Sequence, residues 1–495
     1  MATSSVSSVS SASGSLSSIG LGSGLDVNSI ISQLRTIEEQ PLTLLQNQAT
    51  AIDAKVSAFG QIQSLFSTLS DAANKLAQSS TWSARSVASS DASTVSATAD
   101  STAAVTTLSV EVQQLAKPQI GTTTALPAGQ SLGAGTITLQ LGTWADDGSG
   151  GKAFTAGSSA PVSISVAAGS SLADVATQIN KANAGVTATV VSGTNGAQLL
   201  LRSKDTGAAQ GFQLTSDVAL GTSGNTLALD TTAPGTQWSQ DAKASINGIA
   251  VQSASNTVTG AVQGLTLTLS KTTSAGSPVE IDVNADTDAM KKSIQDFVSA
   301  YNAVNTMIGS LTAYNANAPS GQQASLLQGD STATLLQNQL RNLLSSTVKT
   351  SFGNMSLSDI GITLPPSVGG VVTSTNLQLD DAKLSAALTD VNKVQEFFTA
   401  DTGSMATEGM ARKFKDFTFG VLSVQGTLSV ATQSLQNQKK NITDQQDRIN
   451  ARIDQWETNL RKQYTALDST MAQMTALNNY VSQQIAQWNK SSGNG

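Results

Sequence analysis

Both ends of this chain carry the apolar spacing of helices, and the middle does not. From about residue 27 to 76, and again from about 435 to 488, apolar side chains recur three and four residues apart, which places them on one face of a helix. Residues 88–285 are rich in Ser, Thr, Gly, Ala and Val, and short runs alternate apolar and polar side chains, the pattern of half-buried strands. This order predicts helical ends that pack together around an inserted β-rich part.

We therefore expect an α+β multidomain protein, in which both chain ends form a helical-bundle or coiled-coil leg and two β-rich head domains are inserted between them. A chain of 495 residues is long enough for several domains. The expected divisions are an N-terminal leg segment that is largely disordered in the free protein (1–45), the N-terminal half of the helical leg (46–87), the two parts of a first head domain (88–122 and 240–285), a variable second head domain (123–239), the C-terminal half of the leg (286–430), and a long C-terminal helix or coiled coil whose end is disordered in the free protein (431–495).

The missing residue types exclude several kinds of chemistry. The chain has no His and no Cys, so a Ser-His-Asp triad, a thiol nucleophile, a thiolate zinc site and a disulfide are all impossible. Only 12% of the residues are charged and the net charge is −7, whereas binding to nucleic acid needs clustered Lys and Arg. We expect a protein that is not an enzyme, uses no cofactor or metal, and has no nucleic-acid partner.

Targeting signals in the sequence are equally sparse. No run of 18 apolar residues is present, so membrane insertion is not expected. The Ser-rich N-terminus has no Lys or Arg before Arg35 and no continuous apolar core, unlike a cleaved Sec-type signal peptide. The protein is thus expected either in the cytoplasm or exported by a route that reads another signal.

A first apolar stripe follows Asp26, which is a good helix N-cap. Proline cannot continue the interior of a helix, so Pro41 is expected to end or kink this one. We expect the stripe to contact other molecules of an assembly; its residues are Leu25, Val27, Ile30, Ile31, Leu34 and Ile37.

A second apolar seam runs along the last helix, and about 55 residues at 1.5 Å each would span roughly 80 Å. That length exceeds a single compact domain, so packing within the chain and packing between chains are equally open. If the seam contacts other chains, we expect an oligomer contact through Ile449, Ile453, Trp456, Leu460, Tyr464, Leu467, Met471, Met474, Ile485 and Trp488.

The remaining elements follow from local patterns and caps. We expect strands over 186–191 and 198–203 joined by a turn at 193–196, a short helix over 171–179, and strands over 244–249, 257–262 and 265–269. Helices are expected after Asp286, after Asp330 and after Asp380, the last one running through Val394.

Two motifs invite a ligand-binding interpretation that we do not adopt. The glycine-rich run at 20–24 has no preceding strand and no following Lys, so it is interpreted as a flexible or assembly-linked segment and not as a phosphate loop. The acidic series at 282–288 lacks the Gly and Glu that a calcium loop requires, so it is interpreted as a helix cap.

Several motifs resemble the bacterial flagellar filament cap family, also called the hook-associated cap family. They occur in the family's order along most of the chain, whereas 121–240 departs most from any fixed pattern. The matching stretches are 20–31, 244–248 through 264–269, 297–302, 329–332, 358–362, 379–384 and 464–474; in addition, 171–207 is similar to the "IN" motif of flagellins and caps, with Ile179 and Asn180 at its centre.

This resemblance implies a structural cap at the distal end of the filament, which promotes the insertion and polymerisation of flagellin and is needed for motility. It implies a ring of identical subunits, most often a pentamer, with flagellin and the hook–filament junction protein as neighbours. It further implies an extracellular location at the filament tip, unfolded export through the flagellar type III channel, and a cytoplasmic chaperone that holds the C-terminal helix.

Three alternatives stay open at this point. The chain could be a flagellin-like filament component or a hook–filament junction protein. It could be a surface adhesin for mucin or other glycans, because Ser/Thr-rich β heads often bind them, and adhesion can coexist with capping. An enzyme is the least favoured alternative because His and Cys are missing.

Overall fold

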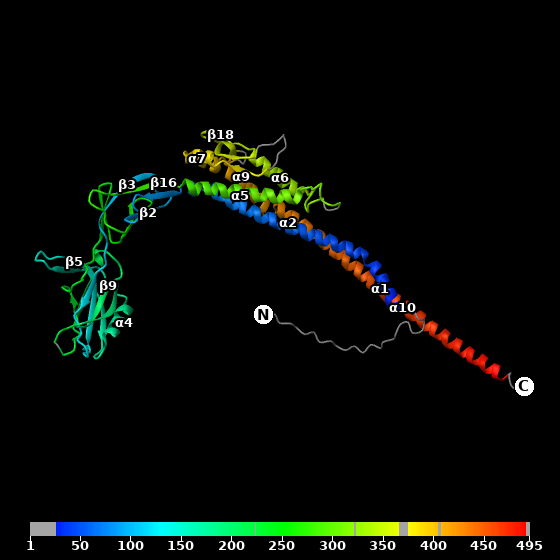
Figure 1. Cartoon of the computed structure of the whole chain (residues 1–495), viewed down its shortest axis with the longest axis horizontal. Coiled ribbons are helices and arrows are strands. Elements are labelled where there is room, and N and C mark those ends of the chain that lie inside the picture. Colours follow the sequence, from blue (N-terminus) through cyan, green and yellow to red (C-terminus); the bar gives the residue numbers. More distant parts are fainter. Residues whose placement is uncertain (1–25, 223, 321–322, 366–374, 404–406, 492–495) are drawn as a thin grey trace.

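In the computed structural model the protein is a long helical leg that carries two β-rich heads at one end (Figure 1). The structure describes residues 26–222, 224–320, 323–365, 375–403 and 407–491. Three separate clusters of buried apolar side chains form the cores of the leg, of the first head and of the second head. The expected α+β class, with both chain ends in the leg and the heads inserted between them, is confirmed.

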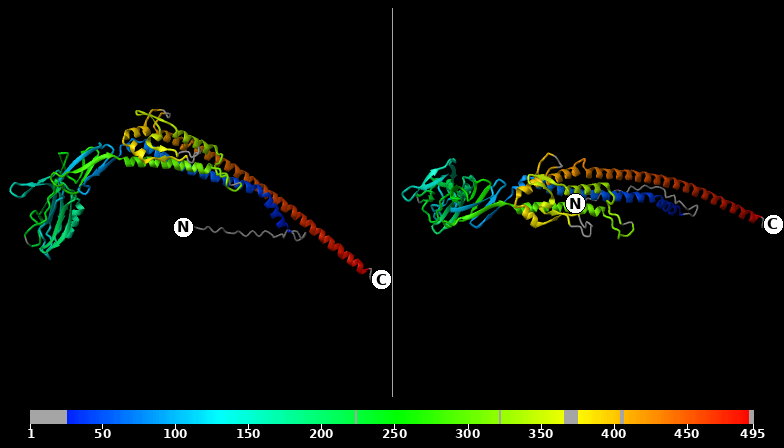
Figure 2. Two further views of the ribbon diagram at one scale, coloured as in Figure 1. Left: turned by 45° about the horizontal axis from the view of Figure 1, so that its top comes forward. Right: turned by 90° about the horizontal axis from the view of Figure 1, so that it is seen from above.

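The leg is built from helices contributed by both ends of the chain. Its two longest members, α2 (Gln40–Ala77) and α10 (Thr427–Ser491), lie side by side in all three views (Figures 1 and 2). The other leg helices are α1 (Val27–Glu38), α3 (Ser79–Trp82), α5 (Thr287–Thr312), α6 (Ser331–Leu344), α7 (Asp381–Ala387), α8 (Val391–Thr399) and α9 (Met410–Leu422).

Pro41 separates α1 from α2 as the sequence predicts. The first helix ends at Glu38, and Pro41 occupies the first turn of the second helix, where its missing N–H leaves no hydrogen bond unmade. The Asp26 side chain accepts a hydrogen bond from Ser29 N at 3.0 Å, which confirms it as the N-cap of α1. The chain therefore bends at Glu39 without losing helical structure on either side.

The leg core gathers aromatic rings from distant parts of the sequence. Phe297 of α5 meets Phe414 of α9 edge to face, with ring centroids 5.0 Å apart. Trp82 stacks on Phe398 at 5.4 Å, and its indole N–H donates to the Leu76 carbonyl oxygen at 2.9 Å. Such pairs contribute specific geometry beyond apolar burial, so the leg closes around a well-defined core near the heads.

One predicted helix is wrong in its extent. The helix expected from Asp380 through Val394 is two helices, because the chain leaves α7 at Leu388 and Asp390 starts α8 by accepting a hydrogen bond from Lys393 N. Helix α9 and short pieces between α6 and α7 were not anticipated. These pieces are the hairpin of β17 (Val348–Thr350) and β18 (Gly353–Met355), the 3₁₀ turn η2 (Leu357–Ile360), and the pair β19 (Ile362–Thr363) and β20 (Gln378–Leu379).

The first head packs a five-stranded antiparallel sheet, in the order β1-β16-β3-β12-β13, against a three-stranded one, in the order β14-β15-β2. This sheet contains strands that precede the second head in the chain and strands that follow it, since β3 pairs with both β12 and β16. The strands are β1 (Arg85–Ser89), β2 (Val95–Ala99), β3 (Thr106–Gln114), β12 (Ala242–Ile246), β13 (Ile249–Ser253), β14 (Thr257–Val262), β15 (Leu265–Leu269) and β16 (Val279–Ala285).

A second correction concerns the strand expected over 244–249. It ends at Ile246, and Asn247 and Gly248 form a tight turn into β13 with φ values of 49° and 84°. Asn and Gly tolerate this left-handed backbone better than other residues, and together they favour two-residue hairpins. The expected strands at 257–262 and 265–269 are present with those bounds.

The second head contains two four-stranded sheets and one helix. In one sheet β5 pairs with β10, β6 and β7; the other has the order β11-β4-β9-β8, and α4 packs on β7, β8 and β9. The elements are β4 (Ile120–Thr123), β5 (Gly135–Asp146), β6 (Lys152–Ala156), β7 (Val162–Val166), α4 (Leu172–Ala182), β8 (Val186–Gly193), β9 (Gly196–Ser203), the 3₁₀ turn η1 (Ala208–Gln210), β10 (Gly211–Ser216) and β11 (Leu229–Asp230).

At four places in the molecule, a side-chain amide makes both hydrogen bonds that a neighbouring strand would otherwise make to a backbone N–H and C=O. In each case one Asn or Gln donates to a carbonyl oxygen and accepts from the N–H of the same residue, at distances between 2.6 and 3.0 Å. This bond pair satisfies backbone groups that no neighbouring strand reaches. The pairs are Gln119 with Phe212, Asn180 with Ala188, Asn256 with Ala116, and Asn302 with Leu377.

Candidate assembly surface

The last helix changes its surroundings along its length. Leu428 and Leu435, near its start, belong to the leg core. Its middle part contacts α2 and α1, and its final part runs on past the end of α1 toward the C-terminus (Figures 1 and 2). The same helix is therefore a core element at one end and a projecting rod at the other.

The N-terminal stripe lies against this helix more closely than its sequence suggests. Val27 and Ile31 are each only 1% exposed, and Ile30 is half-buried, because α1 packs on α10 of the same chain. Leu34 and Ile37 remain exposed, and Leu25 lies outside the described residues. The stripe thus has a partner within one subunit for part of its length, whereas its role in an assembly and its disorder in the free protein stay predictions.

The predicted C-terminal seam divides into a covered and an uncovered half. Ile453 is 1% exposed, and Ile449, Trp456, Leu460 and Tyr464 are half-buried. Beyond them every described side chain from 469 to 489 is exposed. The exposed seam residues are Leu467, Met471, Met474, Ile485 and Trp488, and Leu477 and Val481, which the same helical spacing places on the seam, are exposed as well.

The uncovered half is almost free of charge. Asp468 is its only charged residue between 463 and 489, and the rest are Ala, Thr, Ser, Asn, Gln and apolar residues. A helix with so few ion pairs gains little from its own side chains, and lone helices are marginal in water. Its apolar stripe is the most extensive uncovered apolar feature of α10.

A cluster of charged groups joins α1 to the covered half. Arg35 donates through Nε to Glu39 Oε1 at 2.7 Å, contacts Glu457 through Nη1, and lies 3.5 Å from Asp454 through Nη2. One guanidinium therefore connects the end of α1, the start of α2 and the facing turn of α10.

Glu457 is held from two sides. Besides Arg35, Arg461 donates through Nε to Glu457 Oε1 at 2.9 Å, and it also donates through Nη1 to Asn28 Oδ1 at 3.1 Å. The hydrogen bond from Arg35, supported by Arg461, lowers the pKa of the Glu457 carboxyl below its usual range. The carboxylate is thus ionised at neutral pH and ties both arginines to one point.

Two further ion pairs extend this contact along α10. Arg452 lies 3.8 Å from Glu38, and Lys439 lies 2.6 Å from Asp53 of α2. Charged pairs beside an apolar seam are typical of coiled coils and set helix orientation. Sequence reasoning missed this network, although the spacing of Arg35 with Glu39 and of Glu457 with Arg461, four residues each, was a visible signal.

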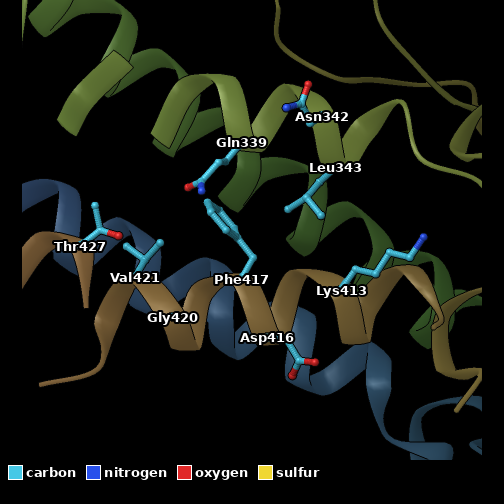
Figure 3. Close-up of a pocket in the computed structure, with 9 residues that line it drawn as sticks. All are labelled: Gln339, Asn342, Leu343, Lys413, Asp416, Phe417, Gly420, Val421 and Thr427. Carbon is cyan, nitrogen blue, oxygen red and sulfur yellow. The ribbon is translucent and has the colours of Figure 1, made fainter. Parts of the chain in front are cut away.

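A shallow hollow of about 460 Å³ lies on the leg between α6 and α9 (Figure 3). Leu343 and Phe417 point into it, whereas Asp416 points away from α6. Lys413 is buried beside it and donates to the Thr347 carbonyl oxygen at 2.9 Å, and burial lowers the pKa of its ammonium. The hollow is therefore an apolar depression with a lysine engaged in holding the backbone.

The residues that the structure describes contain neither a membrane-spanning helix nor a cluster of metal-binding side chains. None of their helices combines the length and apolar content that crossing a membrane requires. Within the same residues, no three His, Cys, Asp or Glu side chains come together in an arrangement that could hold a metal ion.

Family models match most of the chain. The model of the flagellar hook-associated protein 2 N-terminus matches residues 23–119, and that of its C-terminus matches residues 239–476. The flagellin hook IN motif matches residues 149–205. At the centre of that motif Ile179 is fully buried, and the Asn180 amide makes the bond pair with Ala188 described above.

Relatives match over nearly the full length. Flagellar hook-associated protein 2 of Escherichia coli K12 is 32% identical over 95% of this chain and 98% of its own length. The protein of the same name from Salmonella typhimurium is 30% identical over 96% of this chain and its entire length.

A solved structure agrees with these sequence matches. The crystal structure of the D1-D2-D3 domains of the flagellar cap protein FliD from Escherichia coli matches 77% of this chain and 99% of its own, with 28% identity and a TM-score of 0.56. The chain therefore belongs to the flagellar hook-associated protein 2 family, the family of the flagellar cap protein FliD.

Proposed function

We propose that this protein caps the distal end of the flagellar filament as a ring of identical subunits, most simply a pentamer. The heads form a plate, and the helical legs reach down to the filament. Flagellin subunits are inserted and polymerise beneath the plate, and the hook–filament junction protein is the cap's first neighbour before a filament exists. The role is structural, and cell motility depends on it.

The observation that carries the proposal is the uncovered apolar stripe on α10. Leu467, Met471 and Met474 are 39–63% exposed, and the stripe continues through Ile485 toward the end of the helix. Burying such side chains would stabilise a complex by about 1.5–3 kcal/mol each, whereas a lone subunit leaves this energy unused. A structure that presents several parallel helices to each other, as a ring or filament does, would bury them.

The sequence of this chain suits both export in an unfolded state and ordering during assembly. We propose that it leaves the cell unfolded through the flagellar type III channel, while a cytoplasmic chaperone covers the α10 seam. A chain without Cys forms no disulfide that would oppose threading. On this view the outer parts of 1–45 and 431–495 are partly disordered before assembly and become ordered on docking.

Electron microscopy of the purified full-length protein tests the proposal. We expect rings or stacked plates at high concentration, and specific binding of the protein to the tips of filaments stripped of their caps. Filaments formed by the purified protein alone would instead indicate a flagellin-like component. A protein that stays monomeric at high concentration and ignores filament tips would contradict the capping function.

A matched pair of variants connects this test to α10. Met474→Gln with Ile485→Gln removes apolar surface from the stripe at exposed positions, so the subunit should fold normally. Ala472→Gln with Ala476→Gln adds amides of the same kind on the opposite side of the helix, as the helical spacing places them. We expect only the first pair to abolish rings and binding to the filament tip.

A further inference from the structure

We propose that the two heads form one rigid arm, and that an aromatic brace outside both head cores sets the angle between them. The brace consists of Trp144 and Phe154 of the β5–β6 hairpin and Trp238 of the connection between the heads. The outer half of the hairpin is therefore a positioning element for the connection and not a part of the second head's core. This inference concerns a single free subunit, so it goes beyond the capping function.

The connection between the heads consists of two short chain segments. The chain passes from the first head to the second at 115–119 and returns at 237–241. These segments pair through Lys117 and Gln240, whose backbone groups exchange hydrogen bonds of 2.9 and 3.1 Å. A two-stranded ribbon is marginally stable on its own and twists readily, so the connection by itself predicts a hinge.

The β5–β6 hairpin extends beyond the sheet to which it belongs. Strand β5 pairs with β7 over 135–139 and with β10 over 137–142, whereas over 143–146 its pairing among the described strands is with β6 alone. Figure 1 shows the hairpin projecting beside the connection, at the end of the second head nearer the first. Within the described residues, the buried apolar clusters of the two heads include none of the three brace rings. The outer half of the hairpin thus lies at the connection and outside both cores.

The hairpin meets the connection through the three half-buried rings of the brace. The Trp144 ring centroid lies 5.0 Å from that of Trp238 and 5.1 Å from that of Phe154, with planes tilted by 54° in both pairs. At such distances aromatic pairs add a preferred geometry to apolar burial. Trp144 Nε1 also donates to the Phe212 carbonyl oxygen at 3.0 Å, and the same oxygen accepts from Gln119 of the other connecting segment. One indole therefore joins the hairpin, the start of β10 and the connection.

Two glycines allow the brace rings to approach the backbone closely. A Cβ at Gly211 would lie 3.0 Å from Trp144 Cδ1 and 2.7 Å from the Gly142 carbonyl oxygen. A Cβ at Gly142 would lie 2.6 Å from Phe154 Cζ. Non-bonded carbon atoms pack best about 3.5–4.0 Å apart, so a side chain at either position would displace the rings.

A second contact holds the second head against the first head and the end of the connection. Thr206 Oγ1 donates to the Ala254 carbonyl oxygen at 2.8 Å, and Ala208 N donates to Asp241 Oδ1 at 2.6 Å. Between these bonds Gly207 has a φ of +112°, and a Cβ there would lie 2.8 Å from the Ala254 Cβ. Together with the brace, this contact holds the second head at two points, and a swing of the head would break both.

The consequence for assembly rests on the proposed function. Copies in a ring would present their second heads at one common angle, which is what a continuous plate requires. The brace lies in the heads and not in the leg, so a subunit with a loose second head would keep its leg contacts and lose the order of the plate.

Distances between two spin labels in the free full-length protein test the brace. The chain has no Cys, so Ala173→Cys on α4 and Thr259→Cys on β14 place one label on each head at exposed positions. We expect one narrow distance distribution in this labelled parent and a distribution about twice as wide in Trp144→Ala, because domains without a firm interface move relative to each other. Adding Asp241→Ala should widen it further, whereas Trp144→Phe, which keeps a ring in the brace, should stay close to the parent.

Phe352→Ala is the control, since it removes an exposed ring from the leg and should leave the distribution unchanged. A broad distribution in the parent would overturn the inference, as would equal widths in the parent, Trp144→Ala and the double variant. Calorimetry that shows an unfolded second head in Trp144→Ala would also overturn it, because the ring would then belong to the fold of that head. All three outcomes concern the free subunit and leave the capping function untouched.

Discussion

Replacement of Asn302 by Ala should destabilise the leg although it removes only a few atoms. Asn302 Nδ2 donates to the Leu377 carbonyl oxygen at 2.9 Å, and its Oδ1 accepts from Leu377 N at 2.6 Å. Leu377 is 5% exposed, so water reaches these backbone groups poorly. The variant would leave one donor and one acceptor of Leu377 without their partners.

The expected loss follows from the cost of such orphaned groups. Each buried donor or acceptor left unsatisfied costs about 1–3 kcal/mol, so the pair costs about 2–6 kcal/mol. Ala favours a helix over Asn by about 0.6 kcal/mol, and this gain offsets a small part. We expect the free energy of unfolding of the leg to fall by about 3 kcal/mol.

Urea unfolding of the full-length protein, followed by far-ultraviolet circular dichroism at the helical band, measures this change, because most helices belong to the leg. Asn441→Ala is the matched control, since Asn441 is an exposed residue of α10 and surface changes usually stay within about 0.5 kcal/mol. If both variants unfold at the same urea concentration, the amide bond pair does not hold Leu377, the residue before β20, to α5, and the reasoning is wrong.

Three further predictions concern other parts of the molecule. Trp456→Ala should weaken self-association or chaperone binding by about 2–4 kcal/mol if a partner buries the ring, and unchanged sedimentation and pull-down results would count against that burial. Acidification should release α1, because the pKa of Glu457 in the folded protein lies below its unfolded value near 4.5. The stability that ionised Glu457 gives to the α1–α10 contact is therefore complete above that value and is lost as the pH falls through the folded pKa. Distances between spin labels on α1 and α10 would show the release, and constant distances down to pH 2–3 would refute it. Gly264→Ala should destabilise the first head by more than about 1 kcal/mol, since φ is +72° and a Cβ would lie 2.4 Å from Ala103 N; calorimetry that shows no change in this head would refute the argument.

The sequence predicted the leg well because its signals are local. Helical spacing and side-chain caps at Asp26, Asp286 and Asp330 identify helices that the structure contains. Two local signals were overlooked: Asn247-Gly248 marks a hairpin turn, and Asp390 marks a new helix. In both cases we extended a strand or helix along a longer apolar pattern, although one or two residues within it end that element in the structure.

Sheet pairing could not be predicted in the same way. In the first head β1 pairs with β16, so Val87 lies opposite Val283 across nearly 200 residues of chain. Alternation shows that a segment is a strand, but it does not identify the neighbour, since any half-buried strand offers the same face.

The sequence predicted which residues form the α10 seam, but not which of them are buried and which are exposed in the subunit. Heptad spacing places Ile453 and Ile485 on one seam, yet only the structure shows that the first is buried, between the ion pairs that join α10 to the N-terminal helices, and that the second is exposed. That difference depends on where α1 docks, which Arg35, Glu457 and Arg461 help to decide. Polar contacts between residues more than 400 positions apart leave no periodic trace in a single sequence.

The central claim is that the bare half of the α10 seam is the surface through which the protein acts at the filament tip. The most direct measurement is swimming in soft agar by cells that lack their own cap protein and receive this chain with Met474→Gln and Ile485→Gln. We expect folding like the parent, loss of swimming, and flagellin released into the medium, whereas Ala472→Gln with Ala476→Gln should swim normally. Normal swimming by the Met474 and Ile485 variant would contradict the account.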